Sequence, residues 1–173
     1  MILVDTGLPA GPPEEKPDET SPAYTGKDIC SYMEAFAALG YKPEQVTKIL
    51  LTHKHSDQSG EIRSFPNAKI YVGGEELSAA ELQGVPNLVP VQYTDGAYYN
   101  FPESQKIGEG ITMIRAKGHT NGNSIVIVEK TACSICSTGT LPTWMKRCTP
   151  TSCPWCLTIG PPPGKPWTGC GNL

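Results

Sequence analysis

The sequence has no long apolar run and no surplus of charge of one sign. No stretch approaches the roughly 20 apolar residues that a helix needs to cross a bilayer. The formal net charge is -3, and no stripe of Lys and Arg of the kind that binds nucleic acid is present. The first residues lack the charged region and the cleavage site of a secretory signal. We therefore expect a cytoplasmic protein whose partners include neither nucleic acid nor a membrane.

Cysteine and tryptophan are almost absent from the first 132 residues. Cys30 is the one cysteine there, whereas the other six cysteines and all three tryptophans lie at positions 133 to 170. Residues 130 to 173 in turn contain no Asp, Glu or His. This change in composition predicts a boundary near Glu129 and Lys130. It would separate a globular domain at residues 1 to 129 from a Cys-, Pro- and Trp-rich tail at residues 130 to 173.

Short apolar strands alternate with helical segments through the first 129 residues. The predicted strands are residues 2 to 4, 46 to 51, 68 to 72, 88 to 93, 111 to 116 and 124 to 129, and the predicted helices are residues 27 to 39, 59 to 64 and 75 to 82. Residues 83 to 110 are otherwise loop-rich. In the first helix Ile29, Met33 and Phe36 recur at helical spacing, Cys30 is expected to be packed, and Gly40 follows at the C′ position. The alternation predicts an α/β layered fold.

Histidine is scarce, with three residues in the whole chain, and all three follow predicted strands. His53 and His55 lie one residue apart, and alternate residues on extended backbone point to the same side, so both rings can reach one ion. His119 lies in a glycine-rich loop. Three imidazoles are typical of a zinc site whose fourth position stays open to water. The alternative is a set of ordinary surface histidines, but Asp57 favours the metal site because a carboxylate there can hold a neighbouring position or orient a ligand.

Three motifs, in this order, resemble the metallo-β-lactamase superfamily. They are Asp5-Thr6-Gly7 after a strand, Thr52-His53-x-His55-x-Asp57, and Gly118-His119-Thr120. The resemblance implies an αββα sandwich with a hydrolytic site for one or two metal ions, usually zinc. Because the chain opens directly in a strand and its tail lacks the sandwich pattern, we expect this sandwich to be incomplete at both ends.

The resemblance also implies roles for individual residues. His53, His55 and His119 would hold the first metal ion, Asp57 would help to hold a second, and Asp5, Gln58, Gly118 and Thr120 would support the site. The implied activity is attack of metal-activated water on a lactone, thioester, amide or phosphoester of a small-molecule substrate. Asp57 would orient the water or accept its proton. The order of segments is most similar to the N-acyl-homoserine-lactone lactonase branch.

Two departures from the superfamily pattern reduce the predicted site to one zinc ion. The superfamily motif has a histidine directly after the aspartate, whereas this chain has Gln58, and an amide is a poor zinc ligand. The superfamily also uses a later bridging aspartate and a late histidine, but no Asp follows Asp95 and no His follows His119. The first metal site is therefore complete, and a second ion would be weakly held.

The tail has three interpretations. Cys133-x-x-Cys136 and Cys153-x-x-Cys156 have the spacing of a zinc ribbon, which would make the chain a non-enzymatic zinc-binding module. A shift of the reading frame explains the tail differently, because the other frame permits His-Gly-Asp near residues 137 to 140, where the superfamily has its bridging aspartate. The chain would then be a truncated, inactive relic of a hydrolase. The third interpretation is a plain disordered tail.

The coding DNA decides between these interpretations. We expect codons 125 to 173 of an independent clone to permit His-Gly-Asp in the shifted frame, because Cys and Trp codons both begin with TG and yield apolar residues when read one base out of frame. Codons that cannot give that tripeptide would show that the cysteine tail is genuine, and would favour the zinc-binding module.

Overall fold

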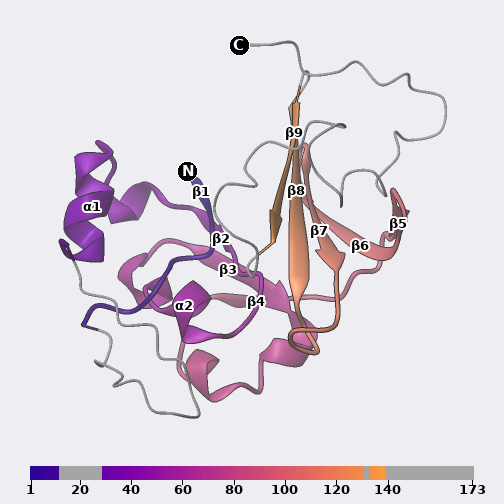
Figure 1. The fold of residues 1–173 in the computed structure, drawn as a ribbon, viewed down its shortest axis with the longest axis horizontal. Coiled ribbons are helices and arrows are strands. Elements are labelled where there is room, and N and C mark those ends of the chain that lie inside the picture. Colours follow the sequence, from indigo (N-terminus) through magenta and orange to yellow (C-terminus); the bar gives the residue numbers. More distant parts are fainter. Residues whose placement is uncertain (12–28, 131–132, 139–173) are drawn as a thin grey trace, which may run out of the picture.

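The computed structural model describes residues 1–11, 29–130 and 133–138, which form two stacked sheets (Figure 1). The first sheet is parallel, with neighbours in the order β1 (Ile2–Val4), β2 (Lys48–Leu50), β3 (Lys69–Gly73) and β4 (Leu88–Val91). The second sheet is antiparallel, in the order β5 (Gly96–Tyr98), β6 (Phe101–Gly108), β7 (Ile111–Arg115), β8 (Ser124–Lys130) and β9 (Cys133–Thr138). The chain therefore completes one sheet before it begins the other.

The parallel sheet is the middle layer, because its strands bury side chains on both faces. In β2, Ile49 enters a core with the helices, and Leu50 enters a second core with Met113 and Val126 of the antiparallel sheet. All four side chains are 0% exposed. Adjacent residues on a strand point to opposite faces, and a parallel sheet covered on both faces has continuous apolar strands. The unbroken apolar run at the end of β2 is therefore what suits this strand to the middle layer.

Short helices cover the outer face of the parallel sheet (Figure 1). They are α1 (Tyr32–Ala38), η2 (Ile62–Ser64) and η4 (Ala80–Leu82), where η marks a 3-10 helix. The other short helices of the described residues are η1 (Pro43–Gln45), α2 (Ser56–Ser59) and η3 (Gly74–Glu76). Phe36, Ile62 and Leu82 join the core that Ile49 enters. Helices, parallel sheet and antiparallel sheet thus form three successive layers of the expected αββα sandwich. Within the described residues, no helix is long and apolar enough to cross a membrane.

Helix α1 begins later than the sequence pattern predicts. The Ser31 hydroxyl accepts a hydrogen bond from the Glu34 N–H at 3.2 Å, and the Glu34 carboxylate accepts one from the Ser31 N–H at 2.9 Å. This capping box starts the helix at Tyr32. The prediction that Ile29 and Cys30 are packed on a helical face is wrong, since both are exposed; residues 27 and 28 lie outside the described residues. The predicted C′ glycine is confirmed, because the residue after Leu39 has φ +79°.

Three further predictions of secondary structure differ from the structure. The helix predicted at residues 59 to 64 is replaced by α2 and η2, and the one predicted at residues 75 to 82 is two separate turns, η3 and η4. Residues 83 to 110 were expected to be loop-rich apart from β4, but they also form β5 and β6. Strand β6 has little apolar alternation and forms along β7, with Ser104 opposite Ile114. Hydrogen-bonded pairing with β7 therefore outweighs the weak intrinsic preference of the β6 residues for strand structure.

Strand β9 lies beyond the predicted domain boundary at Glu129 and Lys130. It pairs with β8, and Cys133 lies opposite Lys130 while Cys136 lies opposite Ile127. The second Cys-x-x-Cys pair, at residues 153 to 156, lies outside the described residues. The boundary and the interpretations of the tail therefore stay predictions.

The aromatic contact of α1 with the core provides a test of this packing. Phe36 is 5% exposed, and its ring centroid lies 5.3 Å from that of Phe65 in an edge-to-face arrangement. We expect Phe36→Ala to lower the free energy of unfolding by about 3 kcal/mol, because it removes a buried ring and leaves a cavity. Leu39→Ala at the end of the same helix, where the side chain is 69% exposed, should lower it by less than about 0.5 kcal/mol. Urea unfolding measures both, and equal losses would contradict this packing of α1.

Candidate metal centre

The three histidines converge where strands of the two sheets end. His53 and His55 follow β2, and His119 follows β7. His53 Nε2 lies 3.1 Å from His55 Nδ1, which lies 2.9 Å from His119 Nε2. Nitrogen ligands of a tetrahedral zinc ion are about 3.4 Å apart when each bond is about 2.0–2.1 Å long. The structure therefore brings together the three rings that the sequence assigns to one ion, at nearly the required spacing.

A chain of hydrogen bonds holds the ring of His53. The Asp5 carboxylate accepts bonds from the Thr52 N–H at 2.8 Å and from the Thr52 hydroxyl at 2.9 Å. Because the hydroxyl donates its one proton to Asp5, its oxygen is the acceptor for His53 Nδ1–H, 3.2 Å away. That tautomer leaves the lone pair on Nε2, the atom that faces the other two rings.

Burial and nearby charges set the protonation states of His53 and Asp5 in this hydrogen-bonded network. Desolvation, followed by the neighbouring rings of His119 and His55, lowers the pKa of His53 to about 4, so the ring is neutral at pH 7, as a metal ligand must be. Burial raises the pKa of Asp5 to about 6, against the lowering effect of its bonds from Thr52. Asp5 is therefore still mainly a carboxylate at pH 7. Its backbone has φ +57°, in the left-handed region where Asp and Asn are enriched.

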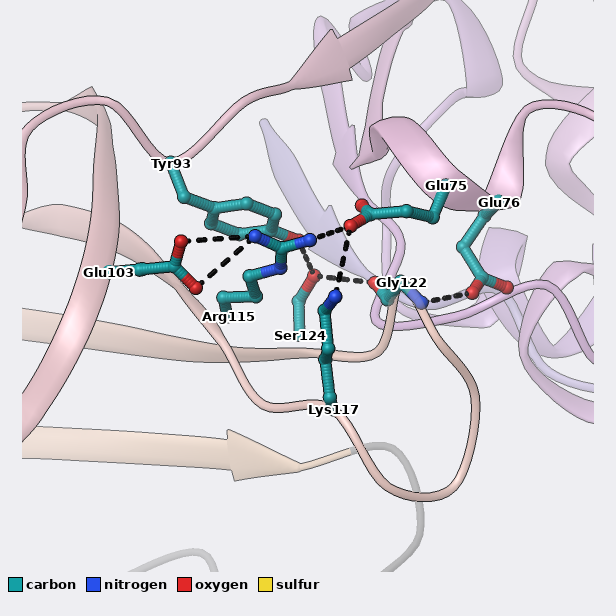
Figure 2. Close-up of polar contacts among 8 residues, drawn as sticks. All are labelled: Glu75, Glu76, Tyr93, Glu103, Arg115, Lys117, Gly122 and Ser124. Atoms are coloured by element: carbon teal, nitrogen blue, oxygen red, sulfur yellow. Dashed lines mark hydrogen bonds and ion pairs between the residues drawn. The ribbon is translucent and has the colours of Figure 1, made fainter.

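The loop after β7 is attached to both sheets. Ser124, the first residue of β8, donates its N–H to the Thr52 carbonyl at 2.8 Å, and its hydroxyl lies 2.6 Å from the Tyr93 hydroxyl (Figure 2). The Gly118 N–H donates to the Thr120 carbonyl at 3.2 Å, and Gly118 has φ +154°. Since a side chain would be strained at this φ, position 118 suits glycine. The buried Thr120 hydroxyl has no hydrogen-bond partner among the described residues.

Comparison with known proteins assigns the chain to a family. A sequence model described as the metallo-beta-lactamase superfamily matches residues 1–141. The chain belongs to the metallo-β-lactamase superfamily. It is 26% identical over 143 residues to an N-acyl homoserine lactonase of Bacillus cereus, a match that covers 74% of this chain and 53% of that protein. The chain thus spans about half the length of the curated relatives it matches.

Solved structures of this superfamily share the fold. An N-acyl homoserine lactone hydrolase with the product N-hexanoyl-L-homoserine at its catalytic metal centre aligns with a TM-score of 0.57 at 22% identity, covering 79% of this chain and 57% of that one. AidC, a dizinc quorum-quenching lactonase, aligns with a TM-score of 0.53 at 19% identity, covering 78% of this chain and 50% of that one. These likenesses confirm the metallo-β-lactamase sandwich expected from the sequence.

Asp57 and Gln58 are not part of the cluster of three rings. Among the residues that the structure describes, the group of ligand atoms within 4.8 Å of one another consists of the three histidines. The Gln58 Nε2 amide donates a hydrogen bond to Asp57 Oδ2 at 2.7 Å. The charge of Asp57 partly opposes the desolvation that lowers the pKa of His53, and it adds to the burial that raises the pKa of Asp5. The predicted roles of Asp57 as ligand and as catalytic group, and of Gln58 as support, stay predictions.

The donor set fits one zinc ion. Three imidazole nitrogens that converge within hydrogen-bond distance of one another can turn their lone pairs to one cation. Three such ligands leave a fourth position open. A cavity of about 760 Å³ adjoins the centre, with His55, His119 and Gly118 among its lining residues. This volume falls in the range of small-molecule sites.

Sequence reasoning missed Glu76 and gave no role to Thr52. Glu76 is 2% exposed, and its carboxylate accepts hydrogen bonds from the N–H groups of Lys54 and Gly122. Nothing in the sequence distinguishes Glu76 from Glu75, because the partners of Glu76 are backbone amides that carry no sequence signal. For Thr52 a signal was present, since it directly precedes the first histidine of the motif.

The Thr52 hydroxyl can be removed with little change in side-chain shape. We expect Thr52→Val to weaken zinc binding about 10- to 100-fold, because the His53 Nδ1–H loses its acceptor and the ring its fixed tautomer. Thr52→Ser keeps the hydroxyl and should bind zinc like the unmodified chain. Competition with a chromophoric chelator measures the dissociation constants. Equal affinities of the Val and Ser variants would contradict the role of the hydroxyl.

Proposed function

We propose that this chain is a zinc-dependent hydrolase that acts on lactones or related esters of small molecules. The observation that carries the proposal is the convergence of three imidazole nitrogens beside a cavity of about 760 Å³. The relatives support the substrate class, because the curated ones are N-acyl homoserine lactonases and one fold neighbour holds a homoserine product at its catalytic metal centre. The cytoplasmic location expected from the sequence stays a prediction.

We propose that the centre takes one zinc ion, whereas one of the fold neighbours is a dizinc lactonase. Gln58 replaces the histidine of the superfamily motif and donates its amide to Asp57. The later aspartate and histidine of the superfamily pattern have no counterpart in the sequence. A second ion would therefore have Asp57 as its main ligand, which is too few for a stable site.

The residues around the ion would bind substrate and move a proton. A bound zinc ion polarises a carbonyl and makes water acidic enough to attack it at neutral pH. Asp57 Oδ2 is held by Gln58, so Oδ1 is the oxygen that would take the proton from the attacking water and deliver it to the leaving alkoxide. Thr52 and Asp5 would hold the ring of His53 in one tautomer and orientation throughout.

Removal of one ring tests the proposal. We expect His119→Ala to lose bound zinc and lactone hydrolysis together, because two histidines remain where three are needed. Lys117→Ala, two residues earlier and with a side chain that is 55% exposed, should keep both. Zinc content is measured by elemental analysis, and hydrolysis of an N-acyl homoserine lactone by pH-stat titration.

The other outcomes identify the alternatives. Unchanged lactone hydrolysis in His119→Ala would rule out the proposed centre. Zinc that survives the loss of His53 and His119, but not of Cys153 and Cys156, would show a zinc-binding module in the tail. Zinc bound at the histidines without turnover of any lactone or ester would identify an inactive relic.

A further inference from the structure

Glu76 carries a carboxylate that is buried between the two loops that present the histidines. Its side chain lies at the end of η3, and the residue is 2% exposed. Oε2 accepts a hydrogen bond from the Lys54 N–H at 3.1 Å, and Oε1 accepts one from the Gly122 N–H at 2.7 Å; Figure 2 shows the second bond. A buried carboxylate is costly unless it is hydrogen-bonded, and here one donor faces each oxygen.

Each of the two amides belongs to a histidine loop. Lys54 lies between the first two histidines, and Gly122 lies three residues after His119. The loops come from different sheets, since one follows β2 and the other joins β7 to β8. We propose that Glu76 is a positioning residue that sets the distance between the histidine pair and His119. The proposal rests on the metal centre proposed above, and it adds a residue that acts through the backbone of both loops.

The loop that carries His119 packs so closely on Glu76 and on the end of β3 that neither Gly122 nor Gly73 has room for a side chain. A Cβ atom at Gly122 would lie 2.6 Å from Glu76 Cγ and 2.7 Å from Oε1, and a Cβ atom at Gly73 would lie 2.3 Å from the Gly122 carbonyl oxygen. Real Cβ atoms essentially never come within 3.0 Å of such neighbours. The loop that carries His119 is therefore seated directly on the carboxylate and on the end of β3.

The neighbouring carboxylate has different partners. Glu75 pairs with Arg115 and lies 3.6 Å from Lys117 Nζ, and Arg115 also bonds Glu103 at 3.0 Å (Figure 2). These ion pairs are partly exposed, and exposed pairs contribute little to stability. The bond from Gly122 to Glu76 is buried and the one from Lys54 is partly buried. Both are charge-assisted, which makes each roughly twice as strong as a neutral hydrogen bond. Glu76 is thus the member of this acidic pair that can fix the loops.

Cobalt(II) titration tests the proposal without relying on turnover. The unmodified chain, Glu76→Gln and Glu103→Gln are titrated in competition with a chelator, and the visible d–d absorption is recorded. We expect Glu76→Gln to weaken cobalt binding about 10- to 100-fold and to alter the spectrum, because an amide offers one acceptor oxygen to two N–H donors. Glu103→Gln removes the same charge from an exposed ion pair and should change neither.

The Gly122→Ala variant tests whether Glu76 acts through its contact with the loop or only through its charge. The variant keeps the carboxylate, but its methyl group occupies the space of Oε1, so we expect a comparable loss of cobalt affinity. The double variant of Glu76→Gln and Gly122→Ala should bind no more weakly than the weaker single variant, because both changes break one contact. Additive losses would contradict the proposal and show that Glu76 acts by charge alone.

Amide hydrogen exchange in the metal-free chain provides a second readout. The amides of Lys54 and Gly122 should exchange faster in Glu76→Gln, whereas that of Met113 in the core should not change. Unchanged exchange together with unchanged cobalt affinity would overturn the proposal and leave the metal centre intact. Absence of cobalt binding by the unmodified chain would overturn both, and so distinguishes the two failures.

Discussion

The hydrogen bond from the Ser124 N–H to the Thr52 carbonyl, 2.8 Å long, joins the two sheets where the metal centre lies. One histidine loop follows the parallel sheet and the other belongs to the antiparallel sheet, so neither sheet alone contains the three rings. The apolar core around Leu50, Met113 and Val126 supplies the attraction between the sheets. The polar contacts at its rim then set the register at which the loops meet. The geometry of the centre is therefore a consequence of how the sheets stack.

Much of this arrangement could be predicted from the sequence, because it depends on residue types with few alternative uses. Only three histidines are present, each follows an apolar strand, and the alternation of His53 and His55 on extended backbone brings their rings to one side. The apolar strands β2 and β7 are likewise evident from their composition. The metallo-β-lactamase resemblance rests on the same motifs. Strong local signals and the fold agree at these positions.

What could not be predicted depends on pairing rather than on composition. Strand β6 has few apolar residues in alternation and forms by pairing with β7. The turns η3 and η4 take the place of one longer predicted helix. Glu76 and Glu75 are adjacent and chemically identical, yet one accepts hydrogen bonds from two backbone amides and the other lies among partly exposed basic groups. Contacts of this kind are made by backbone atoms that every residue has. A sequence pattern therefore does not reveal them.

The left-handed backbone of Asp5 imposes two requirements on one position. At φ +57° a non-glycine residue is uncommon, and Asp and Asn are the types that tolerate it best. The two donors of Thr52 need two acceptor oxygens on the side chain. Asn meets the first requirement but has one acceptor, Glu meets the second but not the first, and Gly has no side chain to offer. Aspartate alone among these residues satisfies both, so variation at this position should be more restricted than at the exposed positions around it.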